Sequence, residues 1–403
     1  MRNFTDLPPL SLYIHIPWCL KKCPYCDFNS HENRHDVLPE QEYVDALLAD
    51  LQQELPEIWG RQIVSIFIGG GTPSLFSASA IDSLLSGVRA LTAASPTVEI
   101  TMEANPGTFE QKKFRDFREA GINRLSIGVQ SFNDQCLNAL GRVHDSGEAE
   151  RAFVMAREAG FDNINIDLMY GLPEQSLTMA HADLSTAINL QPEHISYYQL
   201  TLEPNTLFAS QPPALPHDDI RWDMHTQGVQ LLSEYGFKRY EVSAYARDNN
   251  TCQHNQNYWL YGDYVGIGAG AHGKLSMAAT GEIVRRWKRK HPTQYLEHAH
   301  SEQRIGGQHT VTAEDTALDF LMNALRLTDG FTIPLFQLHT GMALHQWQTV
   351  INKAIDDGLL ETKGVSLSTT EHGFDYLNEL LERFIPDEAE HRYPVIPLLQ
   401  SKD

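Results

Sequence analysis

The chain has 403 residues, of which 42% are hydrophobic and 21% are charged; this is typical of two or three packed domains and argues against global disorder. The net charge is −21, from 31 basic and 52 acidic residues, which argues against binding to nucleic acid because phosphate binding needs a positive surface. No segment approaches the roughly 18 apolar residues of a transmembrane helix, and the N-terminus has no apolar segment of the signal-peptide type. We therefore expect a cytoplasmic protein.

Six short apolar or alternating runs predict β-strands at 11–17, 63–68, 98–102, 124–129, 163–168 and 194–200. Each is followed by a segment with helical periodicity, at 44–55, 81–91, 109–120, 148–159, 177–190 and 220–235. Consecutive strand–helix units predict a parallel sheet with right-handed crossovers. Periodicity alone leaves open whether this sheet is doubly wound and open, or a closed or partial barrel.

Polar or glycine-rich segments follow the predicted strands. A cysteine cluster follows the first strand, the run 69–73 follows the second, and Glu103, Gln130 and Asp167 lie at the ends of later strands. In a barrel all these strand ends share one rim, which is where active sites lie. We therefore predict an α/β fold, a partial barrel of six (β/α) units within residues 1–300.

The pattern changes after residue 235. A further strand is predicted at 239–245, and a second domain is predicted over 301–385. In that domain, helices at 312–327, 343–355 and 374–384 accompany a small hairpin at 359–367, which indicates a helical, winged-helix-like module. Residues 386–403 are predicted to form a flexible tail.

Three of the five cysteines lie close together, in the loop after the first strand. Cys19, Cys23 and Cys26 have the spacing C-x3-C-x2-C, and thiolates are good ligands for an iron–sulfur cluster or for zinc. A four-iron cubane held by three cysteines keeps one iron open for a non-protein ligand. Structural zinc needs a fourth protein ligand, which His15 or His31 could supply, so the spacing leaves both metals open.

The segment from Tyr13 to Cys26, followed by the run 69–73, resembles the radical S-adenosylmethionine (SAM) superfamily. It is most similar to the branch that contains oxygen-independent coproporphyrinogen dehydrogenases and heme chaperones, and the resemblance covers about residues 11–385. It implies a six-unit partial barrel in which Cys19 and Cys23, with Cys26, hold a 4Fe-4S cluster. The open iron would bind the amino and carboxylate groups of SAM.

The resemblance also assigns other positions to the SAM site, as aromatic contacts, as backbone that approaches the methionine end, or as polar contacts to methionine, ribose or adenine. These positions are Tyr13, Tyr25, Gly70, Gly71, Thr72, Glu103, Gln130, Arg142 and Asp167. Glycine suits close backbone approach because it has no side chain. Taken singly, each of the four polar residues is better explained as a helix cap, a surface charge or a core hydrogen bond. The shared position of Glu103, Gln130 and Asp167 at successive strand ends favours the SAM site, and Arg142, in a loop, gains less from this argument.

Two features distinguish the branches of this family. The dehydrogenases have a further cysteine at the position of Phe28, and the stretch His254-Asn-Gln-Asn-Tyr-Trp259 resembles the H-N-x-x-Y-W motif of the heme chaperones. The motif implies that His254 is an axial ligand of heme, with Cys252 as a candidate second ligand. Without the motif, His254 would be explained as a hydrogen-bonded loop residue. No C-x-x-C-H stretch occurs, so covalent attachment of c type is not indicated.

The resemblance therefore predicts a heme chaperone that binds heme, a 4Fe-4S cluster and SAM, and that transfers heme to an acceptor protein. It also implies a homodimer. One alternative is an enzyme that decarboxylates coproporphyrinogen through SAM-derived radical chemistry, and another is a zinc-stabilised barrel with no redox role.

Two further motifs need an explanation. Residues 268–273 satisfy G-x-G-x-x-G, but no helix is predicted after them, so a dinucleotide-binding loop is not expected. The basic run 285–290 is predicted to be a solvated loop. The alternative is a surface that pairs with heme propionates or with an anionic partner.

Overall fold

The computed structural model describes residues 2–33, 37–107 and 111–385, so the predicted tail lies outside the described residues. All six predicted strands are present, as β1 (Leu10–Ile16), β4 (Gln62–Gly70), β5 (Ala93–Ala104), β6 (Arg124–Gln130), β7 (Ile164–Tyr170) and β8 (His194–Gln199). They lie next to one another in this order and are parallel. The predicted six-unit partial barrel is confirmed.

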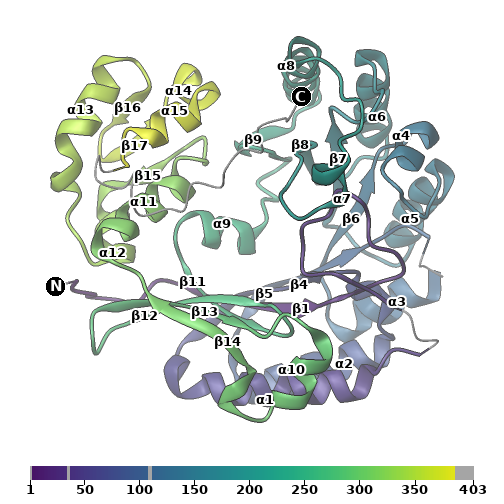
Figure 1. Cartoon of the computed structure of the whole chain (residues 1–403), viewed down its shortest axis with the longest axis horizontal. Helices are drawn as coiled ribbons and strands as arrows, with labels where there is room; N and C mark the ends of the chain where they lie inside the picture. The colour runs from purple at the N-terminus through teal and green to yellow at the C-terminus, as the bar shows by residue number, and fades with distance from the viewer. Residues whose placement is uncertain (1, 34–36, 108–110, 386–403) are drawn as a thin grey trace, which may run out of the picture.

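Helices cover the outer face of these strands (Figure 1). They are α1 (Glu40–Ile58), α2 (Ala78–Leu91), α3 (Gln111–Ala120), α4 (Asp134–Ala139), α5 (Ser146–Glu158), α6 (Leu177–Asn189) and α8 (Asp218–Glu234). The strands are apolar because both of their faces are covered; all seven residues of β6 are buried. Local signals set helix starts, as at α5, where Asp145 and Glu148 form a capping box.

The sheet continues beyond both edges of the barrel to 12 strands. At one edge β11 (Asp263–Ile267) pairs with β1, followed by β12 (His272–Met277), β13 (Glu282–Lys288) and β14 (Ile305–Thr310). At the other edge, the predicted strand at 239–245 is the pair β9 (Lys238–Glu241) and β10 (Ala244–Ala246).

The strands at the β11 edge show what two of the sequence motifs form in the structure. The G-x-G-x-x-G stretch lies at the turn between β11 and β12 and is followed by a strand, so the rejection of a dinucleotide-binding loop is confirmed. The loop interpretation of the basic run is wrong, because its first four residues lie in β13, between β12 and β14.

The C-terminal part forms a separate group of helices with a small sheet (Figure 1). Its elements are α11 (Ala313–Ala324), β15 (Phe331–Thr332), α12 (Ile333–Thr340), α13 (Gln348–Asp356), β16 (Leu360–Lys363), β17 (Ser366–Thr369), α14 (Glu371–Asp375) and α15 (Leu377–Glu382). They enclose a second core around Phe320 and Phe336. The boundary near residue 301 stays a prediction, and β14, which follows it, pairs with β13 of the large sheet. In the described part of the chain, no helix is both long and apolar enough to cross a membrane.

A short helix, α9 (Gln253–Trp259), carries the H-N-x-x-Y-W motif and lies on the open side of the barrel (Figure 1). The C-terminal domain holds its end in place, because the guanidinium of Arg326 lies 4.3 Å from the centroid of the Trp259 ring. Arg326 also forms an ion pair of 3.1 Å with Glu241 in β9. The motif is therefore placed between the barrel and the second domain.

Candidate functional site

The three clustered cysteines lie on one loop that starts where β1 ends. The loop is closed by β2 (Trp18–Cys19) and β3 (His31–Glu32), which pair in parallel. Within it, the amide of Cys26 donates a hydrogen bond of 3.1 Å to the carbonyl of Cys23. All three thiols are free and partly exposed, so they are available to bind a metal.

The glycine run after β4 supports this loop. The amide of Gly71 donates to the carbonyl of Ile16 at 2.8 Å, and the amide of Thr72 donates to the carbonyl of Trp18 at 2.8 Å. A Cβ atom on Gly71 would lie 2.6 Å from the carbonyl oxygen of Trp18, closer than any side chain allows. The glycine run therefore packs against the backbone that carries the first cysteine. This supporting role was not predicted from the sequence.

A cavity of about 350 Å³ opens beside the cysteine loop at the strand ends. All three cysteines line it, together with eight of the nine other positions that the resemblance assigned to SAM. These eight are Tyr25, Gly70, Gly71, Thr72, Glu103, Gln130, Arg142 and Asp167. The barrel therefore brings together residues from five successive strand ends, as the partial-barrel prediction requires.

Hydrogen-bond donors surround the cysteine sulfurs. The hydroxyl of Thr72 donates to Cys19 Sγ at 3.5 Å, and Arg142 Nη1 lies 3.7 Å from Cys23 Sγ. Burial raises the pKa of Cys19 to about 11 and also raises the pKa of Cys26. Bound iron would reverse this, because a coordinating thiol is deprotonated by the metal charge.

Two partly buried carboxyl groups also line this cavity. Burial raises the pKa of Glu103 to about 7, although Glu103 Oε2 accepts a hydrogen bond of 3.0 Å from the amide of Gly70. Burial also raises the pKa of Asp167, whose carboxylate accepts from the hydroxyl of Ser126 at 3.0 Å and from Asn165 at 2.7 Å. Near neutral pH, Glu103 can thus either accept or donate a hydrogen bond to a polar ligand.

Sequence reasoning missed several residues that orient this site. Tyr198 donates a hydrogen bond of 2.8 Å to Gln130 Oε1, and Asn105 Oδ1 accepts one of 2.6 Å from Arg142. The buried carboxylate of Asp183 holds the segment after Gln130, since it accepts from the amide of Phe132 at 2.7 Å. Asn105 lies at a strand end and was detectable by that signal; Asp183 lies in the middle of α6 and was not.

A second cavity, of about 960 Å³, also borders the cysteine loop. His254 lines it and is buried, with its ring centroid 5.1 Å from that of Phe67. His254 Nδ1 lies 3.3 Å from the hydroxyl of Ser65, while Nε2 has no hydrogen-bond partner among the described residues. Burial lowers the pKa of His254 to about 3, so the imidazole is neutral and able to bind a metal.

The two cavities are neighbours, because Cys26, Phe28, Phe67, Glu103 and Trp259 belong to the lining of both. Tyr13, predicted as a SAM contact, lines the second cavity and not the first, and its predicted role stays untested. Cys252 is fully buried and lines neither cavity, although α9 starts directly after it.

Both histidines considered for zinc have other partners. Nδ1 of His15 lies 2.9 Å from the hydroxyl of Tyr13 and its Nε2 lies 3.0 Å from the carbonyl of Asn29. Nε2 of His31 lies 3.3 Å from Asn29 Oδ1. Among the residues that the structure describes, no three His, Cys, Asp or Glu side chains are grouped so that they could hold a single metal ion.

Comparison with known proteins identifies the family. Residues 13–184 match the Radical SAM superfamily and residues 311–376 match the HemN C-terminal domain. The chain is 49% identical to the heme chaperone HemW of Escherichia coli, over 95% of this chain and 100% of that protein. The chain belongs to the HemW family. The HemW of Bacillus subtilis is 33% identical, over 93% of this chain and 99% of that protein.

A solved structure agrees with the fold. The coproporphyrinogen III oxidase HemN from Escherichia coli, a radical SAM enzyme, matches 94% of this chain and 90% of its own with a TM-score of 0.78, at 24% sequence identity. Membership of the radical SAM superfamily implies a 4Fe-4S cluster and SAM as cofactors. Three free thiols beside a cavity lined by polar strand-end residues fit these two groups.

Proposed function

We propose that this protein is a cytoplasmic heme chaperone, which binds heme in the second cavity and transfers it to an acceptor protein. The observation that carries the proposal is that His254, buried and neutral, lines a large cavity and has no hydrogen-bond partner at Nε2 among the described residues. The cavity has aromatic walls that include Tyr13, Phe67 and Tyr258, and a volume of about 960 Å³ is in the upper part of the range for small-molecule sites. An apolar, aromatic wall suits a flat porphyrin, and neutral imidazole is a common axial ligand of heme iron.

The first cavity would hold the other cofactors. Cys19, Cys23 and Cys26 would bind three irons of a 4Fe-4S cluster, and Glu103 would contribute to the polar binding of SAM. When bound, the cluster and SAM supply one-electron and radical chemistry. The protein's own contribution is to hold the cysteine loop, shield the sulfurs and place Arg142 against Cys23. A homodimer is part of this proposal and is tested by sedimentation of the loaded protein.

The main alternative, a coproporphyrinogen dehydrogenase, has less support. Phe28 occupies the position of the additional cysteine of those enzymes, and the similarity to HemN concerns the fold alone at 24% identity. An anaerobic assay of the cluster-loaded protein with coproporphyrinogen separates the two functions. A chaperone forms no protoporphyrinogen, and appreciable product would overturn the proposal.

The heme site is tested by titrating heme into the wild-type protein and into His254→Ala, with the Soret absorbance as the readout. Loss of the axial ligand is expected to weaken heme binding at least about tenfold, or roughly 1.4 kcal/mol. His345→Ala is the matched control, because His345 is exposed and lies in the second domain. Equal affinity of wild type and His254→Ala would remove His254 from the site.

The cluster is tested by anaerobic reconstitution of the wild type and of a variant in which the three clustered cysteines are replaced by alanine. The wild type is expected to contain iron and inorganic sulfide, and the variant neither, because three of the four irons lose their protein ligand. Cys136→Ala serves as control, since Cys136 is buried and lines neither cavity. Zinc in place of iron and sulfide in the wild type would favour the zinc-stabilised barrel.

A further inference from the structure

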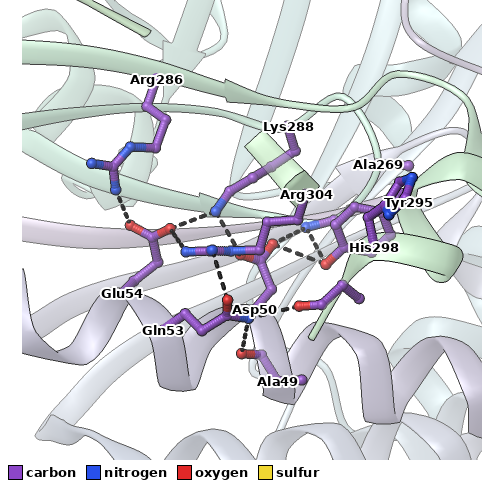
Figure 2. Close-up of polar contacts among 12 residues, drawn as sticks. Ala49, Asp50, Gln53, Glu54, Ala269, Arg286, Lys288, Tyr295, His298 and Arg304 are labelled. Atoms are coloured by element: carbon purple, nitrogen blue, oxygen red, sulfur yellow. Dashed lines mark hydrogen bonds and ion pairs between the residues drawn. The ribbon is translucent and has the colours of Figure 1, made fainter. Parts of the chain in front are cut away.

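The basic run 285–290 contains five cations, and the ion pairs of β13 account for three of them. On the face toward α1, Arg286 pairs with Glu54 at 2.8 Å and with Glu57 at 2.9 Å. Lys288 pairs with Glu54 at 2.6 Å and with Asp50 at 2.5 Å. Figure 2 shows the contacts of Arg286 and Lys288 with Glu54 and Asp50, together with Arg304, which pairs with both of these carboxylates. These cations are neutralised inside the protein.

On the opposite face of β13, a third cationic side chain is also paired. Because side chains alternate along a strand, Arg285 points away from α1 and pairs with Asp319 of α11 at 2.9 Å. Beyond the strand end, Arg289 Nε donates a hydrogen bond of 2.5 Å to the carbonyl of Gln303. Of the five cations, only Lys290 has a side chain without a hydrogen bond or ion pair to the described residues.

The backbone at Lys290 is tied to the cysteine loop. Asn29 Nδ2 donates to the carbonyl of Lys290 at 2.8 Å and to the carbonyl of Ala269 at 2.9 Å. The amide of Gly270 donates to the carbonyl of Arg289 at 2.8 Å. These contacts place Lys290 on the exposed rim of the second cavity, which has His254 in its lining.

The other charged groups of this lining are already engaged or carry the opposite sign. Lys22 Nζ donates to the carbonyls of Phe28 and Ser30, at 3.1 and 3.2 Å. His272 is exposed and stacks on Trp287 with a centroid distance of 6.1 Å. Asp27 is an exposed carboxylate of the lining. Lys290 is therefore the cation of this rim that is free to bind an anionic group.

We infer that Lys290 binds a propionate carboxylate of the heme and so sets the orientation of the porphyrin in the cavity. This inference rests on the proposed function. With the iron at the buried His254 and the apolar ring along the aromatic wall, the two carboxylates are the parts of heme that need water or a cation. Lys290 stands at the exposed rim, where a propionate keeps its hydration while it pairs with the ammonium group.

The test compares heme with heme dimethyl ester, in which both carboxylates are esterified, on wild type, Lys290→Gln and Lys290→Glu. For heme, Lys290→Gln is expected to bind roughly two- to fivefold more weakly, the range of a partly exposed ion pair, and Lys290→Glu more weakly still. For the dimethyl ester, wild type and Lys290→Gln are expected to bind equally. Lys353→Gln, at an exposed lysine of α13, is the matched control.

Three outcomes would contradict the inference, and they can be distinguished. Equal heme affinity of wild type and Lys290→Gln overturns the role of Lys290 and leaves the proposed function intact. An equal loss for heme and for the dimethyl ester shows that Lys290 does not act on a carboxylate. Failure of the wild type to bind heme overturns the proposed function itself. A smaller difference between variants at high salt is expected, because salt screens an exposed ion pair.

Discussion

Burial shifts the pKa values of individual ionisable side chains in the two cavities. His254 is kept neutral, because the pKa lowered to about 3 lies far below physiological pH. Glu103, whose pKa is raised to about 7, responds to small changes of its surroundings. Buried groups with shifted pKa values are typical of functional sites, and these two residues lie in the walls of the two cavities.

The pKa of His254 makes a prediction about stability. As the pH falls below about 6.5, the unfolded chain binds a proton at this histidine and the folded protein does not, so the free energy of unfolding decreases. Between pH 6.5 and pH 5, protonation of this histidine in the unfolded chain is expected to lower the free energy of unfolding by about 2 kcal/mol. Denaturant unfolding of wild type and His254→Gln at both pH values measures it.

The variant is expected to lose less stability than the wild type over this interval. His345→Gln is the control, since His345 is exposed and lies in the second domain. Identical pH dependence of wild type and His254→Gln would show that His254 is not shielded from protonation.

At the scale of elements, the turns after the strands hold the site together. Gly70 has a φ of +117°, and a Cβ atom there would lie 2.4 Å from the ring of His15. The same turn leads to Thr72, which donates to Cys19. A distortion at Gly70 is therefore transmitted to the cysteine loop.

Gly70→Ala is expected to destabilise the protein and to lower the iron and sulfide content after reconstitution. The positive φ costs about 1–2 kcal/mol for alanine, and the clash with His15 adds about 1–3 kcal/mol. Gly60→Ala separates the cost of the positive φ from the cost of the clash. Gly60 also has a positive φ, of +78°, but nothing lies within 4 Å of its Cβ position. If the two variants were equally stable and equally loaded with iron, the clash would have no effect.

At the scale of the whole molecule, buried ion pairs join distant parts of the chain. Lys288 and Arg304 reach Asp50 of α1 across 238 and 254 residues (Figure 2). Asp50 Oδ2 also accepts a hydrogen bond of 2.9 Å from Tyr295, in α10 (Pro292–His298). The network thus connects α1 of the barrel to β13 and α10.

Lys288→Met is expected to lower the free energy of unfolding by about 3–5 kcal/mol, because it leaves Asp50 and Glu54 with too few partners in the interior. The midpoint of thermal or denaturant unfolding measures this. Lys363→Met is the control, since the ion pair of Lys363 with Glu361 is exposed, and no change is expected. A Lys288→Met variant as stable as the wild type would show that the remaining Arg304 is sufficient.

The sequence by itself determined the six strand–helix units and the grouping of three cysteines in one loop. Strand and helix periodicity depends on neighbouring residues, and the spacing of Cys19, Cys23 and Cys26 lies within one loop, so both can be read from local sequence. The rule that strand ends share a rim then placed Glu103, Gln130 and Asp167 at one cavity, as the structure shows.

Only the tertiary structure decided how the second cavity is built and which charges remain free. Three contacts join residues that are far apart in the chain. They are the pairing of β11 with β1, the contact of Tyr13 with His254, and the ion pairs of Arg286 and Lys288 with carboxylates of α1. Their energy comes from packing and burial, which depend on the three-dimensional neighbourhood and leave no local pattern. For that reason the basic run 285–290 looked like a solvated loop, while in the folded protein a single cation of the run, Lys290, stays free at the rim.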